Sequence, residues 1–260
     1  MKKIFLYATA LLLSSVAFTS CNDDKDELTD SRLTNYVVLE MQGDDFVAWP
    51  VGTKYVDEGC KATLGGEDAS SRLVTEGVED VDYNTIGFYE ITYSAVNDDG
   101  FPISVSRTVC VYDPTYTSDI SGKYDTDMAA TVYLGKINGV KDWYPFSDWA
   151  AGYGNTTQCT GLTFQKVVPG IFYCNDLLGG WYWQIRNYGT SYAMTGYVSV
   201  DNDGNVELID SYISGWGDGL DYIEDGKYDF DTKTISYKLC YAGQIYMNPV
   251  MKWVKPLEEE

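Results

Sequence analysis

Apolar and polar residues alternate with a period of two along most of this chain. Alternating stretches rich in β-forming residues include Tyr89–Val96, Ser104–Tyr112, Tyr197–Val200 and Thr234–Leu239. Clusters of Gly, Asn and Asp separate these stretches at short intervals, which is typical of short antiparallel strands joined by turns. The pattern predicts an all-β protein, with at most one short helical turn near Ser147–Gly152.

The alternation stops at Asp113–Asp119, a stretch that contains Pro114. This break predicts two domains, one at residues 33–113 and one at residues 119–256. In the first, glycines at turns and alternating apolar residues are typical of a β-sandwich. In the second, the strand spacing favours an antiparallel meander that forms a barrel or a flattened sandwich.

The amino terminus has the pattern of an export signal. Lys2 and Lys3 precede the apolar run Ile4–Phe18, which is shorter than the roughly 20 residues of a membrane span. Cys21 then follows two small residues directly. This arrangement resembles a bacterial lipoprotein signal, which implies that residues 1–20 are removed and that Cys21 is acylated. The alternative is an ordinary signal peptide with an incidental cysteine.

An acidic segment follows this cysteine, and residues 22–30 read NDDKDELTD. Such a segment has little apolar area to bury, so residues 21–32 are expected to form a solvated tether. In Bacteroidetes-type lipoproteins, acids at this place resemble the address for the outer face of the outer membrane. The resemblance implies a protein that touches the membrane only through its lipid anchor and faces the cell exterior. The alternative is a spacer with no address.

Composition excludes several classes of function. The formal net charge of −21 disfavours nucleic acid and anionic lipid as partners. The chain has no histidine, which excludes Ser–His and Cys–His nucleophile pairs and the HExxH zinc site. No phosphate-binding glycine motif occurs either, so we expect no cofactor, no metal site and no catalytic residues. A hydrolase with two carboxylates remains the distant enzymatic alternative.

Acidic residues beside Gly or Asn are expected to shape turns. Asp201 and Asp203 are the sharpest candidates for calcium, but no Glu closes the loop at the EF-hand distance. The five cysteines after Cys21 are an odd number, so at least one is unpaired or bonded between chains. A Cys60–Cys110 bridge is one option, and buried free thiols are the favoured one.

Four motifs mark the first domain: Val51–Gly59, Gly87–Tyr93, Asp99–Gly100 and Arg107–Val111. Together they resemble the Ig-like modules of bacterial surface proteins. The resemblance implies a β-sandwich that acts as a spacer or support, without a ligand of its own.

The second domain contains PGIFYCND (169–176), GGWYW (179–183) and YDFDTKTI (228–235). This order looks like the C-terminal β-domain that follows an Ig-like module in Bacteroidetes lipoproteins associated with polysaccharide utilisation. The resemblance implies a polysaccharide or oligosaccharide as ligand and an outer-membrane transport partner.

Aromatic residues are the candidate binding groups, because sugars stack their C–H faces on Trp and Tyr rings. If residues 181–186 form a strand, Trp181, Trp183 and Ile185 share a core face. Tyr182 and Arg186 would then lie on the other face. Trp253 alternates with Met251 on the last strand and is also expected in the core.

Other tryptophans lie in non-periodic or Gly-rich stretches, which favour an exposed platform. The predicted ligand-binding residues are Trp143, Tyr144, Trp149, Trp216, Tyr182 and Arg186. The open alternative is that these loops fold back to plug one end of a barrel.

These patterns leave three functions, of which a non-catalytic glycan-binding surface protein is preferred. It predicts a shallow aromatic groove near Trp143, Trp149 and Trp216. A structural or adhesive envelope protein predicts that these rings are buried. A hydrolase predicts two carboxylates that face each other across a cleft.

Overall fold

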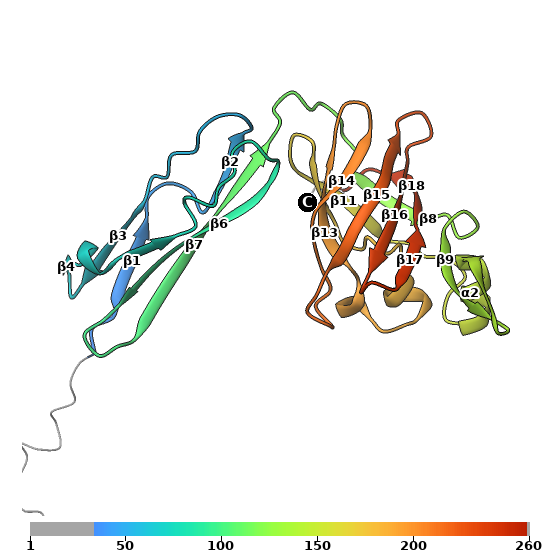
Figure 1. The fold of residues 1–260 in the computed structure, drawn as a ribbon, viewed down its shortest axis with the longest axis horizontal. Coiled ribbons are helices and arrows are strands. Elements are labelled where there is room, and N and C mark those ends of the chain that lie inside the picture. Colours follow the sequence, from blue (N-terminus) through green and yellow to red (C-terminus); the bar gives the residue numbers. More distant parts are fainter. Residues whose placement is uncertain (1–33, 259–260) are drawn as a thin grey trace, which may run out of the picture.

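The structure, a computed structural model, describes residues 34–258. The predicted signal peptide (residues 1–20), the predicted lipidation residue Cys21 and the whole predicted acidic tether (residues 21–32) lie outside the described residues. Two β-rich bodies follow each other along the chain and are joined by residues 113–121 (Figure 1). Within residues 34–258, no helix has the length and apolar character needed to cross a membrane.

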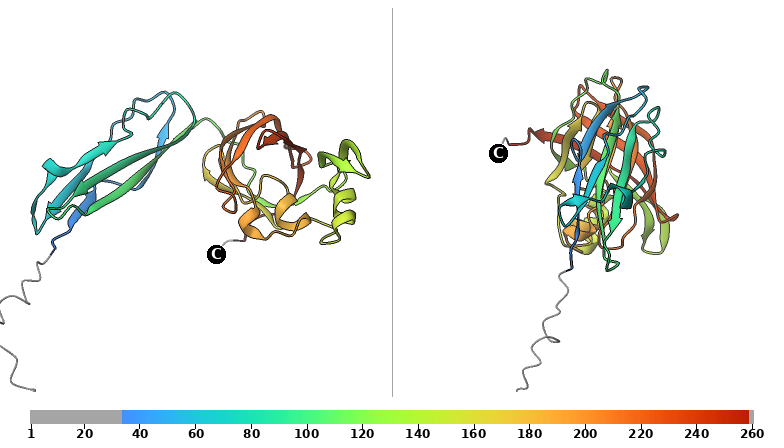
Figure 2. Two further views of the ribbon diagram at one scale, coloured as in Figure 1. Left: turned by 60° about the horizontal axis from the view of Figure 1, so that its bottom comes forward. Right: turned by 90° about the vertical axis from the view of Figure 1, so that its left-hand side faces the viewer.

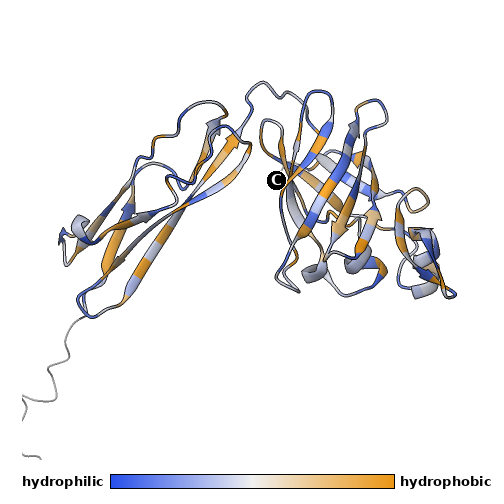
Figure 3. Cartoon of the chain, in the orientation of Figure 1, coloured by the Kyte–Doolittle hydropathy of each residue, from blue (hydrophilic) through white to orange (hydrophobic). Residues whose placement is uncertain are grey.

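The first body is an Ig-like sandwich of two sheets. One sheet has the order β1-β3-β4, with β1 at Val37–Met41, β3 at Cys60–Leu64 and β4 at Glu67–Asp68. The other has the order β2-β7-β6-β5, with bounds Phe46–Pro50, Pro102–Tyr112, Gly87–Val96 and Val74–Glu76. A short 3-10 helix, η1 (Ser70–Arg72), precedes β5. Figure 3 shows how apolar residues recur along the strands of both bodies, as the alternation predicts.

One charged residue is fully buried in this sandwich. The Arg107 guanidinium lies 2.5 Å from the Asp57 carboxylate, and its Nε donates to the backbone oxygen of Asp44. The Tyr93 hydroxyl donates to the same carboxylate at 2.7 Å. A buried guanidinium is tolerated only when it is paired and hydrogen-bonded, so this group has a structural role.

The second body is an eight-stranded antiparallel barrel. Its ring consists of β8 (Gly122–Thr126), β11 (Leu162–Val168), β12 (Ile171–Cys174), β13 (Thr195–Val200), β14 (Asn205–Tyr212), β15 (Leu220–Asp229), β16 (Thr234–Tyr241) and β18 (Val250–Lys255). The ring closes because β18 pairs with both β8 and β16 (Figure 2). The prediction of an all-β protein with an Ig-like body and a barrel is confirmed.

Side chains fill the barrel. Tyr124, Phe164, Phe172 and Tyr237 belong to one buried cluster that extends through the second body. An eight-stranded ring is just wide enough for side chains to occupy its interior. A ligand of the second body is therefore expected at the outside of the wall or at a barrel end.

A second sheet segment branches from the barrel at β16. The first half of β16, Thr234–Ser236, pairs with β18, whereas Leu239–Tyr241 pairs with β17 (Ile245–Asn248). Beyond β17 lie β9 (Val132–Ile137) and β10 (Val140–Pro145), and β10 leads into the helix α2 (Phe146–Tyr153). The short helix predicted near Ser147–Gly152 is confirmed, but Trp143 lies on β10 rather than on a non-periodic loop.

The prediction of a strand at residues 181–186 is wrong. Trp181–Ile185 form a π-helical turn, η2, in which the Arg186 amide donates to the Trp181 oxygen. Gly179 and Gly180 precede it with φ of +64° and +88°, which bend the chain out of an extended path. Trp181 and Ile185 are buried, as predicted. However, Tyr182 is also buried and Trp183 only half-buried, because a helical turn does not alternate.

The two bodies touch through an apolar interface. Cys110 of β7 clusters with Val168 and Ile171 of the barrel. The Phe88 ring lies 4.6 Å from the Tyr197 ring between centroids. Among the described cysteines, Cys60, Cys110, Cys159, Cys174 and Cys240 are free, so the preference for free thiols is confirmed and the Cys60–Cys110 bridge is absent.

Candidate functional site

Trp216 occupies the tip of the turn between β14 and β15. The amides of Trp216 and Gly217 both donate to the Ile213 oxygen, which closes the turn. Gly217 adopts φ of +81°, a conformation that glycine reaches without strain. A Cβ on Gly215 would lie 2.5 Å from the Tyr192 ring, so glycine lets that ring pack beneath the turn. The indole of Trp216 is thereby held outward, 45% exposed.

Tyrosines surround this indole. The Tyr182 and Tyr192 ring centroids lie 4.6 and 4.9 Å from that of Trp216, both in edge-on geometries, and Tyr188 lies 6.3 Å away. Tyr188 is 43% exposed, and with Tyr192 and Trp216 it lines a shallow recess of about 490 Å³. Below them Tyr182 is buried, and burial raises its pKa to about 12. We call Tyr182, Arg186, Tyr188, Tyr192 and Trp216 the Trp216 surface.

Arg186 supplies the positive charge of this surface. Its guanidinium lies 5.2 Å from the Tyr188 ring centroid and 4.7 Å from that of Tyr153 in α2. Its Nη2 also donates to the Tyr188 hydroxyl at 2.6 Å. These contacts keep a planar group with several N–H donors beside exposed rings, where it can bond to ligand oxygens.

A buried carboxylate anchors the segment that carries these residues. Asp176 is fully buried and accepts bonds from the amides of Leu178 and Gly180, just before η2. It also accepts a bond from the amide of Met194, just after the 3-10 helix η3 (Thr190–Tyr192). Burial raises the pKa of Asp176 to about 7, although the three N–H bonds act in the opposite direction. One side chain thus joins both ends of the segment, and sequence reasoning missed it.

Trp149 and Tyr144 lie in a neighbouring aromatic cluster. Trp149 belongs to α2, is half-buried and packs its ring 5.5 Å from that of Trp181 and 6.1 Å from that of Tyr144. Arg186 reaches toward this helix through Tyr153, so the cluster and the Trp216 surface are adjacent.

Trp143 does not join this group. It projects from β10 into a separate recess with Tyr222 and Tyr246. The single groove predicted near Trp143, Trp149 and Trp216 is therefore divided between at least two surfaces. The prediction treated loop tryptophans as one set, whereas the branching of the sheet at β16 separates them.

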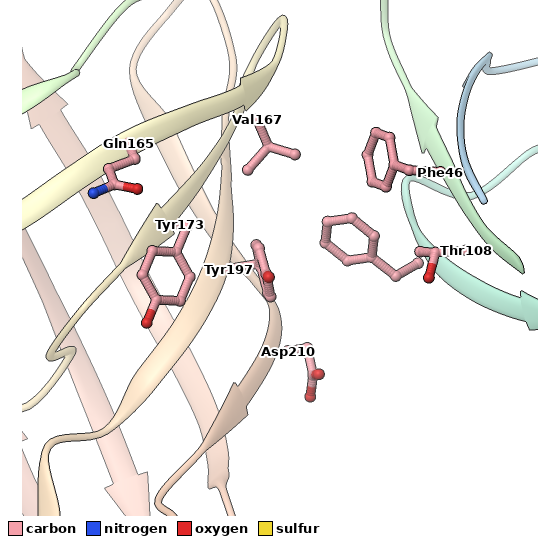
Figure 4. Close-up of a pocket in the computed structure, with 8 residues that line it drawn as sticks. Phe46, Thr108, Gln165, Val167, Tyr173, Tyr197 and Asp210 are labelled. Carbon is pink, nitrogen blue, oxygen red and sulfur yellow. The ribbon is translucent and has the colours of Figure 1, made fainter. Parts of the chain in front are cut away.

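A further recess of about 560 Å³ lies between the two bodies (Figure 4). Phe46 and Thr108 project into it from the first body, and Tyr173, Tyr197 and Asp210 from the barrel wall. Phe88 already packs on Tyr197 there, so these rings take part in the interface of the two bodies. Sequence reasoning missed this recess because its walls come from distant parts of the chain.

The Asp201 turn has the structural role that its neighbours predict. Its Oδ1 accepts bonds from the amides of Asp203 and Asn205 at 2.9 and 2.8 Å. The Asn205 side chain donates to its Oδ2 at 2.6 Å. These bonds lower the pKa of Asp201 despite its partial burial, and they use its oxygens to close the turn.

Two family models match the chain. One is described as a C-terminal domain and matches residues 113–253, more than half of the chain. The other is described as a bacterial surface protein, Ig-like domain, and matches residues 39–111. A search among curated proteins found no match.

Among solved structures, the chain is similar to the lipoprotein BT2262 from Bacteroides thetaiotaomicron. The identity is 31%, over 84% of this chain and 100% of that chain, with a TM-score of 0.43. A second match is a CBM51-2 domain, in complex with GlcNAc, with INT domains of ZmpB from Clostridium perfringens. It shows 19% identity over 42% of this chain and 26% of that chain, with a TM-score of 0.25.

Proposed function

Since this chain belongs to the family of the Bacteroides lipoprotein BT2262, we propose that it is a non-catalytic, lipid-anchored surface protein that binds an extracellular glycan. The proposed anchor is an acyl group on Cys21, after removal of residues 1–20. The acidic segment at residues 21–32 would direct it to the outer membrane, facing the cell exterior. The Ig-like body then serves as a spacer that carries the barrel away from the membrane.

The exposure of Trp216 and Tyr188 carries the proposal. Each ring leaves more than two fifths of its surface in solvent at a built recess, and exposed aromatic groups that rim a recess mark binding sites. Their apolar faces suit the C–H faces of a sugar, and the Arg186 N–H groups suit its oxygens. A purely structural envelope protein has no need of such an arrangement.

The same surface gives little support to hydrolysis. The residues that line its recess are Tyr188, Tyr192 and Trp216, none of which is a carboxylic acid. The nearby Asp218 accepts a bond from the Tyr241 hydroxyl at 2.8 Å. Glycoside hydrolysis by the usual route needs two carboxyl groups that flank the sugar bond, so binding without cleavage is the better reading of this site.

The test is a glycan array followed by calorimetry with the glycan that the array identifies. Trp216→Ala and Tyr188→Ala are each expected to weaken binding by about tenfold or more, as truncated aromatic anchors do. Phe101→Ala is the matched control, since Phe101 is 50% exposed on the Ig-like body. Unchanged affinity in both site variants, or a folded wild-type chain that binds no glycan, would favour the structural or adhesive alternative.

A further inference from the structure

A straight row of side chains crosses the five strands of the branched sheet. Tyr222 on β15 is opposite Cys240 on β16, and Cys240 is opposite Tyr246 on β17. One step along the register of β17 with β9 places Tyr246 beside Leu134, which is opposite Trp143 on β10. Aromatic residues therefore occupy the first, third and fifth places of the row, with smaller side chains between them.

This row lies on the outer face of the sheet. The strand neighbours Ile223, Leu239 and Met247 pack with the barrel core, and successive side chains of a strand point to opposite faces. Trp143 and Tyr222 are each 42% exposed. Figure 1 and the left view of Figure 2 place the segment with β9 and α2 on the side of the barrel away from the Ig-like body.

The spacing of the rings follows from the strand spacing. Neighbouring strands lie about 4.8 Å apart, so rings on alternate strands are about 10 Å apart. In an extended chain of β-1,4-linked pyranoses, one sugar is about as long as one strand separation. Every second sugar presents the same face. Tyr222, Tyr246 and Trp143 therefore have the repeat of alternate sugars in such a ribbon.

A polar row runs beside the aromatic one, two residues along each strand and so about 7 Å away. Glu224 is opposite Lys238, and the next register step places Asn248 beside Lys238. The three side chains provide an acceptor, a donor and an amide that does both. Together with the three rings they line a recess of about 340 Å³.

The charged side chains beside the aromatic row favour a neutral ligand over an anionic one. Lys238 pairs with Asp225 at 2.5 Å, and Glu224 lies opposite Lys238 on the next strand. The two acids outnumber this lysine, and the whole chain carries a formal charge of −21. A chain of uronic acids or sulfated sugars would be repelled, whereas an uncharged chain would not.

We propose that this face, defined by Tyr222, Tyr246, Trp143, Glu224, Lys238 and Asn248, binds a neutral, extended β-1,4-linked polysaccharide. The polymer lies across the strands, with alternate sugars stacked on the three rings and their hydroxyls bonded to the polar row. The inference rests on the proposed function for its ligand class. It concerns a different site, separate from the Trp216 surface.

The test is affinity electrophoresis of the chain from Asn22 onward through gels that contain hydroxyethylcellulose, xylan or soluble starch. We expect hydroxyethylcellulose or xylan to retard the wild type, and starch, whose α-linked chain is curved, to have no effect. Trp143→Ala and Tyr222→Ala are each expected to lower the association constant by about tenfold or more. Phe101→Ala, on the Ig-like body, is expected to leave it unchanged.

The inference would be overturned by no retardation of the folded wild type by either extended polymer, by equal retardation by starch, or by unchanged retardation in the Trp143 and Tyr222 variants. Loss of retardation in Trp216→Ala alone would also overturn it, while it would sustain the proposed function. Retardation that depends on Trp143 and Tyr222, in a chain whose Trp216 variant binds every glycan normally, would sustain the inference and contradict the proposed Trp216 site.

Discussion

At the scale of single residues, two buried ionisable groups each join segments of the chain that are separate in the sequence. Arg107 and Asp57 join strand β7 to the chain between β2 and β3 inside the Ig-like body. Asp176 joins the two ends of the segment that carries η2 and η3. In each case a polar side chain satisfies groups that an apolar residue of similar size would leave unpaired.

Asp57→Asn is expected to destabilise the Ig-like body by roughly 3–5 kcal/mol, because it leaves the Arg107 guanidinium buried without a counter-charge. Chemical denaturation followed by circular dichroism measures the loss. The control is Asp98→Asn, which removes the exposed partner of Arg72 and is expected to cost less than about 1 kcal/mol. Equal stability of the two variants would contradict the structural role of Arg107.

Asp176 predicts a pH dependence of stability. Its carboxyl pKa is near 3.8 when exposed and about 7 in the folded protein, because burial disfavours its charged form. The folded state therefore keeps a proton that the unfolded state releases. The contribution of Asp176 to stability is complete below about pH 4 and declines by about 1.4 kcal/mol per pH unit up to about pH 7.

Unfolding titrations of the wild type and of Asp176→Asn between pH 4 and 8 measure this contribution as a difference. The subtraction matters because other carboxyls, such as Asp127 and Asp201, have lowered pKa values in the folded protein. These carboxyls make the folded state more stable as the pH rises, which is the opposite of the effect of Asp176. We expect the advantage of the wild type over the variant to shrink as the pH rises. A difference that stays constant over this range would show that Asp176 does not titrate there.

At the scale of elements, the β14–β15 turn positions the Trp216 surface. Gly215→Val would place carbon atoms against the Tyr192 ring, where even a Cβ lies at 2.5 Å. We expect a loss of about 1–3 kcal/mol in stability, as in other overpacked sites, and weaker glycan binding in calorimetry. In Gly152→Ala the new Cβ meets nothing within 4 Å. This control is expected to gain about 0.5–1 kcal/mol in stability and to bind glycan as the wild type does. Equal stability and equal glycan binding in the two variants would contradict the role of Gly215.

Alternation along the chain was enough to predict an all-β protein, because period-two burial is a local property. The Ig-like body was predicted from the resemblance of its motifs, and the strand spacing of the second body left a barrel and a flattened sandwich open. Alternation failed at residues 181–186, where Trp and Tyr alternate as in a strand. There the positive φ values of Gly179 and Gly180 and the bonds to Asp176 decide the path. The candidate site was predicted only in part for a different reason: Trp143 and Trp216 are both exposed, but only the register of distant strands shows that they lie on different surfaces.

At the scale of the whole molecule, the proposed anchor, spacer and binding body follow one another along the chain. The Phe88 ring of the spacer packs on the Tyr197 ring of the binding body. In this arrangement the proposed anchor must hold the spacer and the binding body at the membrane.

Cys21→Ser is therefore expected to move the protein from the membrane fraction to the soluble fraction, because a hydroxyl cannot take the place of the acylated thiol. Fractionation and immunoblotting measure the distribution, and protease treatment of intact cells tests exposure of the wild type. Cys60→Ser is the control and is expected to stay with the membrane. Retention of the Cys21 variant in the membrane fraction would contradict the proposed anchor.

If the chain is exported as proposed, the closure of the barrel by β18 has a consequence for the order of folding. The Ig-like body is complete once Tyr112 has left the membrane, and it can fold while the rest of the chain is still in transit. The ring cannot close until β18 arrives to pair with β8, near the opposite end of the second body. Such pairing of distant segments is slow, so the barrel edges stay open to chaperones and proteases until the last strand is in place.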